Sequence, residues 1–254
     1  MRLLAFETAT PLGGAALLID GVIVGERTIE GSSTHSRHCL AFAEELLRGA
    51  DLAWKDLTAV AASHGPGSFT GVRTGLTLVK GLAWSLGIPC VSVSTLEAMA
   101  LHAAGAGHEY ILPVLDARMK ETYAALFLPR NATSPDWRFS PGNATSPDWR
   151  FSSLYPTRLT EDLCLTPEAL IARVLTHAPA DKILLCGEGA KTYAPIFTTA
   201  GFPFAERERF HACPSAVAIL ASRAIEDGKA MTPENLAALY LRDATRPPGA
   251  GSSA

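Results

Sequence analysis

The stretch that decides the fold is His64-Gly-Pro-Gly-Ser-Phe-Thr-Gly-Val-Arg-Thr-Gly75. An apolar segment precedes it and predicts a buried strand, and the apolar spacing over 68–86 predicts a helix. The stretch is therefore expected to be a strand-to-helix turn. Gly65 and Gly67 allow a tight backbone turn, and Ser68 is placed to cap the free N–H groups of the helix start. Such a start can also hold an anion.

Glycine recurs every four residues through this helix, at Gly67, Gly71 and Gly75, and therefore lies on one face. Glycine inside a soluble helix costs up to about 1 kcal/mol relative to alanine. Close approach of another backbone would offset that cost. The spacing alone leaves open whether this neighbour belongs to the same chain or to a partner subunit.

The flanking residues predict an α/β layer. Upstream, three strands are expected at 3–9, 15–19 and 22–29, with Asp20-Gly21 as a hairpin turn, followed by a helix over 34–49. Downstream, a short strand at 90–93 precedes Ser94-Thr-Leu-Glu97, a capping box that opens a third helix. The order βββαβαβα is typical of a ribonuclease-H-like unit.

A second unit is expected after Ala104-Gly-Ala-Gly107, which is typical of a linker. We therefore place a first domain at 1–105, a second domain at 106–246 and a disordered tail at 247–254. Further expected elements are strands at 111–117, 121–128 and 182–186, and helices that open at Thr166-Pro167, Cys213-Pro214 and Thr232-Pro233.

One internal repeat is present. The segment NATSPDWRFS at 131–140 recurs unchanged at 143–152. It is rich in Asn, Ser, Pro and Asp, which favours an exposed loop over 131–152. Deleting one unit, 131–142, is expected to leave the fold and partner binding intact.

Composition excludes several classes of protein. The chain has 254 residues, 48% of them hydrophobic, a formal net charge of −3, and five cysteines without a CxxC pair. These numbers argue against a disulfide framework, a zinc site and a protein that grips nucleic acid by itself. We expect no signal peptide and no membrane span, and therefore a cytoplasmic protein.

The stretch GPGSFTGVRTG resembles the signature of the TsaB (YeaZ-type) family. Asp116-Ala-Arg-Met-Lys-Glu-Thr-Tyr123 is similar to the family's second-domain motif, and Tyr240-Leu-Arg242 is a weaker match near the C-terminus. The resemblance covers roughly residues 1–128 and 160–243, so the duplicated segment falls outside it.

This resemblance implies two ribonuclease-H-like domains of the actin/hexokinase/Hsp70 (ASKHA) superfamily, the second smaller or degenerate. It implies a non-catalytic platform subunit, paired with a TsaD-like catalytic subunit and assisted by a TsaE-like ATPase. That complex transfers a threonylcarbamoyl group to the adenosine beside the anticodon in tRNA, which this chain would contact only through the complex. A homodimer of the isolated chain and a nucleotide at the complex interface stay open, and no intrinsic cofactor is implied.

Family members join their partner through their first two long helices. The resemblance therefore implies partner contacts on both expected helices, and Gly75→Leu is expected to keep the chain folded while abolishing partner binding. The implied contact residues are Cys39, Phe42, Leu46, Gly67, Gly71, Val72, Gly75, Leu76 and Val79.

Some residues of the chain are also found in metal sites and in hydrolases. His35 and His38, three apart on a helix, could approach one metal ion, but no neighbouring Asp or Cys completes a site. A glycoprotease-like hydrolase would use Ser68, His64 and Asp116, yet the flanking Pro66 and Thr70 do not form a nucleophile elbow.

A stand-alone ATP-binding enzyme of the same superfamily is the third alternative. Such enzymes carry an Asp at the end of the first strand, where this chain has Glu7, and Mg²⁺ demands tight geometry. We therefore expect no ATP hydrolysis or tRNA modification by the isolated chain. The candidate nucleotide contacts are Glu7, Thr8, Gly65, Gly67, Ser68 and Asp116.

Overall fold

The structure, a computed structural model, describes residues 1–31, 35–104, 107–129, 155–206 and 210–241. The duplicated segment at 131–152 and the tail at 247–254 lie outside these ranges, as do the linker residues 105–106. All five cysteines are free thiols. In the part of the chain that the structure describes, no helix is both long enough and apolar enough to cross a membrane.

The first unit is built on a five-stranded sheet in the order β3-β2-β1-β4-β5. The first three strands form the expected antiparallel meander, and β4 and β5 continue parallel to β1. This is the order of a ribonuclease-H-like layer, so the predicted fold class is confirmed. The strands are β1 (Arg2–Glu7), β2 (Leu12–Ile19), β3 (Val22–Glu30), β4 (Ala59–Ser63) and β5 (Cys90–Val93).

The second unit repeats the same plan in reduced form. The strands β6, β7 and β10 form an antiparallel meander, β11 runs parallel to β6, and a short β8–β9 pair is attached to β6. Its strands are β6 (Tyr110–Arg118), β7 (Glu121–Ala124), β8 (Phe127–Leu128), β9 (Thr157–Arg158), β10 (Leu163–Leu165) and β11 (Ile183–Cys186). Its helices are α4 (Pro167–Val174), α5 (Glu188–Thr192) and α6 (Ala194–Thr199).

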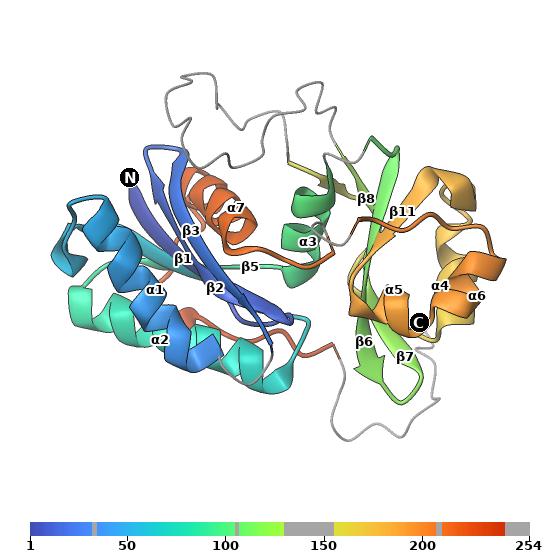
Figure 1. Cartoon of the computed structure of the whole chain (residues 1–254), viewed down its shortest axis with the longest axis horizontal. Coiled ribbons are helices and arrows are strands. Elements are labelled where there is room, and N and C mark those ends of the chain that lie inside the picture. Colours follow the sequence, from blue (N-terminus) through green and yellow to red (C-terminus); the bar gives the residue numbers. More distant parts are fainter. Residues whose placement is uncertain (32–34, 105–106, 130–154, 207–209, 242–254) are drawn as a thin grey trace.

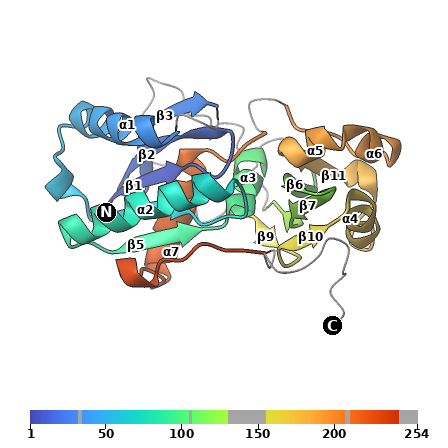
Figure 2. The same cartoon turned by 90° about the horizontal axis from the view of Figure 1, so that it is seen from below.

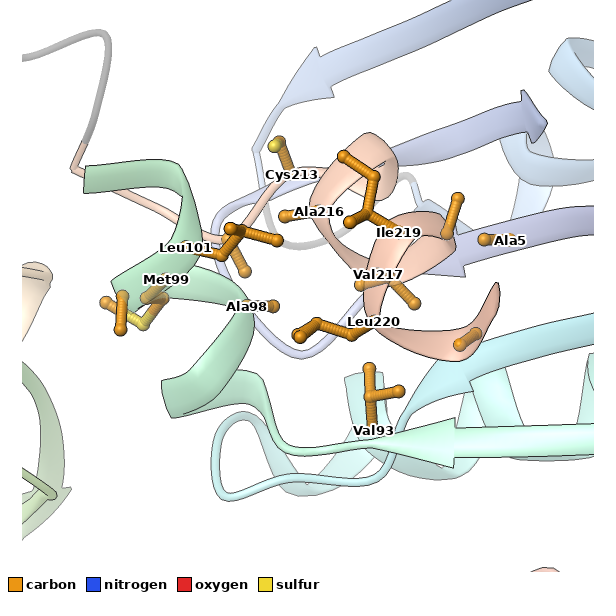
Figure 3. Close-up of a cluster of buried hydrophobic side chains, with 14 of the residues drawn as sticks. Ala5, Val93, Ala98, Met99, Leu101, Cys213, Ala216, Val217, Ile219 and Leu220 are labelled. Atoms are coloured by element: carbon orange, nitrogen blue, oxygen red, sulfur yellow. The ribbon is translucent and has the colours of Figure 1, made fainter. Parts of the chain in front are cut away.

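Helices cover both faces of the first sheet (Figure 1). One core cluster packs α1 (His35–Gly49) and α2 (Phe69–Leu86) on one face, and another packs α3 (Thr95–Ala103) and α7 (Pro214–Glu226) on the other. Figure 3 shows the second cluster, in which Ala216 and Leu220 of α7 lie beside Leu101 and Ala98 of α3. Helix α7 therefore packs on the first sheet, although its residues fall within the second unit expected at 106–246.

The chain after α7 returns to the first unit. Met231 exchanges two backbone hydrogen bonds of 2.9 Å with Cys90 at the edge of β5, and the Leu239 N–H donates to the His64 carbonyl at 2.9 Å. Between these anchors Leu236 is buried. The prediction of a helix that opens at Thr232-Pro233 is therefore wrong. Only one 3₁₀ turn forms, Pro233–Asn235, because the anchors at both ends keep the chain extended.

The glycine face of α2 packs inside the chain. A Cβ atom on Gly71 would lie 2.0 Å from the Thr8 carbonyl oxygen, and one on Gly75 would lie 2.4 Å from Thr8 Oγ1. At Gly67, the corresponding contact would be 2.5 Å from the Ala9 carbonyl oxygen. Thr8 Oγ1 also donates to the Gly71 carbonyl at 2.7 Å. Because the turn after β1 fills this face, Gly75→Leu is expected to disrupt the fold, contrary to our expectation from the sequence.

One carboxyl group is buried where β1 meets that turn. Glu7 is fully buried, and its Oε1 accepts hydrogen bonds from the backbone N–H groups of Ala9 (2.6 Å) and Thr10 (3.1 Å). Burial raises the pKa of Glu7 to about 7, although these two hydrogen bonds act in the opposite direction. The folded chain therefore holds a proton here that the unfolded chain, with an ordinary pKa, would release.

Two alanine substitutions in α2 test the glycine packing. Gly71→Ala should destabilise the chain by more than about 2 kcal/mol, because its methyl group overlaps the Thr8 backbone. Gly81→Ala is the matched control, since nothing lies within 4 Å of its added methyl group, and it should stabilise by about 0.5–1 kcal/mol. Urea unfolding of both variants measures the difference. Equal stabilities would contradict the packing.

Glu7 predicts a pH dependence of stability. As the pH rises from about 4.5 to about 7, the folded state holds more protons at Glu7 than the unfolded state, so stability falls across this window. Glu7→Gln keeps the acceptor oxygen and removes the titration. At pH 8 it should be more stable than the unchanged chain by up to about 3 kcal/mol, with no such gain at pH 4.5. Urea midpoints that change in parallel with pH would refute this role for Glu7.

Candidate partner-binding surface

The turn between β4 and α2, residues 64–68, begins the family signature, and we call it the signature turn. The turn that follows β1 holds it in place. The Ser68 N–H donates to the Ala9 carbonyl at 2.8 Å, and the Ser68 hydroxyl caps α2 by accepting from the Gly71 N–H at 3.2 Å. Gly65 has a φ of +104°, which favours glycine. These contacts fix both the start and the direction of α2.

Most positions expected to bind a partner lie in the chain's own core. Five of them have relative exposures between 0% and 6%: Cys39, Leu46, Val72, Leu76 and Val79. Phe42 is half-buried and stacks on His38, with 5.7 Å between ring centroids. The three glycines face Thr8 and Ala9, as described above. The face that these expected residues form on α1 and α2 therefore points inward.

The opposite face of α2 is exposed and carries large side chains. Trp84 is 73% exposed and Phe69 is 57% exposed. Together with the three residues between them at helical spacing they form what we call the outer stripe: Phe69, Arg73, Thr77, Lys80 and Trp84. On the neighbouring helix α1, Leu40 is 43% exposed. Exposed aromatic residues gathered on one helix face are typical of protein interfaces.

An open groove of about 550 Å³ runs along the first half of this stripe. It is lined by Phe69, Thr70, Arg73, Thr74, Thr77 and Leu78. The Arg73 guanidinium carbon lies 3.7 Å from the centroid of the Phe69 ring, and Arg73 Nε donates to the Tyr240 hydroxyl at 3.0 Å. The weak C-terminal motif thus contacts the signature helix. A helical-wheel reading of 69–84 could have found the stripe, whereas nothing in the sequence links Tyr240 to Arg73.

The nucleotide candidates do not gather around one opening. Glu7, Thr8, Gly67 and Ser68 hold the contact between the β1 turn and α2, and a Cβ on Gly65 would lie 3.2 Å from the Leu239 carbonyl oxygen.

Asp116 lies in the second unit, at the end of β6. It accepts a 2.8 Å hydrogen bond from the Arg118 N–H, and the Tyr193 hydroxyl donates to it at 3.5 Å. Asp116 therefore stabilises the β6–β7 turn, in which residues 118–120 have left-handed backbones.

The hydrolase and metal candidates are placed as follows. The Ser68 hydroxyl is used as the cap of α2, and Asp116 belongs to the other unit. The side chain of His35 falls outside what the structure describes, and His38 stacks on Phe42. No group of three or more His, Cys, Asp or Glu side chains suited to a metal ion occurs among the described residues.

Known proteins resemble this chain in sequence. The family described as "TsaD: tRNA N6-adenosine threonylcarbamoyltransferase" matches residues 28–138. The "tRNA threonylcarbamoyladenosine biosynthesis protein TsaB" of Bacillus subtilis is 38% identical over 134 residues, which cover 52% of this chain and 57% of that protein. Its Escherichia coli namesake is 37% identical over 126 residues, covering 49% and 54%. In these matches the chain spans about half the length of its curated relatives.

The solved structure named "YeaZ from Pseudomonas aeruginosa" resembles the chain over nearly its whole length. The TM-score is 0.74 at 25% sequence identity, and the match covers 94% of this chain and 99% of that one. The family match over residues 28–138 includes the signature turn, α1 and α2, and the structural similarity extends to the second unit. Sequence and fold together identify the chain as a TsaB/YeaZ-type protein.

Proposed function

We propose that this chain is a non-catalytic partner subunit in the synthesis of threonylcarbamoyladenosine in tRNA, and that it binds a TsaD-like subunit through the outer stripe of α2 and the adjoining face of α1. The observation that carries the proposal is the outer stripe itself. It exposes Trp84 and Phe69 on a helix whose other side is fully used by the core.

The similarity to the TsaD family supports a pairwise contact between like surfaces. That similarity covers residues 28–138, which include both α1 and α2. A related partner would present an equivalent pair of helices, and two equivalent surfaces can associate about an approximate two-fold axis. The same geometry would let the isolated chain form a homodimer.

Charge supports a platform role over direct tRNA binding. The chain has a formal net charge of −3. Phosphate contacts dominate the affinity of proteins for nucleic acids. In this proposal tRNA is therefore held mainly by other subunits of a cytoplasmic complex, which would include a TsaE-like ATPase, and any nucleotide would be bound at the interface between subunits.

Replacing Trp84 tests the proposed surface. Trp84→Ala should weaken binding to the TsaD-like subunit from the same cell by about tenfold or more, because a tryptophan that becomes buried in an interface contributes strongly to the binding energy. Leu175→Ala is the matched control, an apolar side chain of 43% exposure in the second unit. Calorimetric titration gives the affinity, and circular dichroism checks the fold.

The same variants should separate in a reconstituted tRNA-modification reaction at limiting concentrations of the chain. Trp84→Ala should lower the yield of threonylcarbamoyladenosine, and Leu175→Ala should not. Unchanged affinity and unchanged yield with Trp84→Ala would rule out the proposed surface. Modification of tRNA by this chain alone would rule out a non-catalytic role.

A further inference from the structure

The segment 231–241, which we call the C-terminal strap, lies against the start of α2. It is anchored to β5 through Met231 and to the signature turn through Leu239, and it buries Leu236 between them. Figure 2 shows the chain after α7 running along the first unit toward the second. Tyr240 of the strap therefore lies at the first turn of α2, although it is 167 positions away from Arg73 in the sequence.

Arg73 is held from two sides. Its guanidinium carbon lies 3.7 Å from the centroid of the Phe69 ring, and its Nε donates to the Tyr240 hydroxyl at 3.0 Å. The two rings also contact each other, with 5.9 Å between centroids and 45° between planes. A flexible arginine is thereby restricted to one orientation before any ligand arrives, which lowers the entropy lost on binding.

The Arg73 guanidinium group has no acidic partner among the residues that the structure describes. No carboxylate among the described residues forms an ion pair with Arg73, and α2 contains no Asp or Glu. The contact with Tyr240 uses Nε, so the two terminal nitrogens keep their N–H groups for a ligand. Two such nitrogens match the two oxygens of a carboxylate.

We infer that Tyr240 is a positioning residue that orients Arg73 to bind an Asp or Glu side chain of the partner subunit, at the edge of the groove along the outer stripe. This inference rests on the proposed function for the identity of that subunit. A protein carboxylate fits the site better than an RNA phosphate, because the chain has a formal net charge of −3, which does not favour the approach of a polyanion.

A double-mutant cycle tests the inference, with the purified TsaD-like subunit as the probe. Tyr240→Phe keeps the ring and removes only the hydroxyl that accepts from Arg73. It should weaken binding about threefold to tenfold, and Arg73→Gln should weaken it by about tenfold or more. The double variant should bind no more weakly than Arg73→Gln alone, because Tyr240 acts through Arg73. Both single variants should also lose part of the salt dependence of the affinity.

Tyr193→Phe is the matched control, since it removes a tyrosine hydroxyl that is hydrogen-bonded in the second unit. It should bind normally. Circular dichroism should show the same melting temperature for Tyr240→Phe as for the unchanged chain, because Tyr240 is 54% exposed.

Other outcomes would overturn the inference in distinguishable ways. Normal binding by Tyr240→Phe and Arg73→Gln, with weakened binding by Trp84→Ala, would remove the inference and leave the proposed function standing. Normal binding by all three variants would remove both. Additive losses would mean that Tyr240 touches the partner directly and does not position Arg73. Loss of binding to tRNA alone, with the subunit bound normally, would assign the site to RNA.

Discussion

The close contact between α2 and the turn after β1 is the constraint on which the rest of the structure depends. Gly71 and Gly75 bring the helix against the backbone and side chain of Thr8, so closely that a methyl group does not fit. This contact fixes the rotation of α2 about its axis. Because one side of the helix is committed to Thr8 and to the apolar core, Phe69 and Trp84 must face outward.

The same contact connects the signature turn to the C-terminus. The Ser68 N–H donates a hydrogen bond to the Ala9 carbonyl group, and the Leu239 N–H of the strap donates one to the His64 carbonyl group. The turn after β1, the turn before α2 and the C-terminal strap therefore meet at the N-terminal end of α2. The groove is lined by residues of α2, and Arg73 joins its edge to Tyr240 of the strap.

The sequence was sufficient for most of the fold. The meander β1–β3, the helices α1 and α2 and the strand β4 follow from hydrophobic periodicity and turn residues, which act over short distances. It could not orient the glycine face, because Gly71 and Gly75 meet a segment more than sixty residues away in the chain. The strap was misread for the same reason: the anchors at Cys90 and His64 override the local helix signal at Thr232-Pro233.

The candidate surface was predicted only in outline. The resemblance of the signature implied partner contacts on α1 and α2, but individual residues that it implied, such as Val72 and Leu76, face the core. The apolar stripe of an amphipathic helix usually faces the protein interior. Applied to α2, this rule places Val72 in the core, where the structure has it. The contact between Arg73 and Tyr240 depends on the path of the strap, which no local pattern encodes.

Hydroxyl-radical footprinting read by mass spectrometry tests the central claim, that the outer stripe of α2 is the partner-binding surface. It compares the oxidation of exposed side chains in the isolated chain and in its mixture with the TsaD-like subunit. Oxidation of Phe69, Trp84 and Tyr240 should fall in the mixture, while Met119, which is 60% exposed on the second unit, should be oxidised as before. Protection of Met119 with no change at Phe69 and Trp84 would contradict the account.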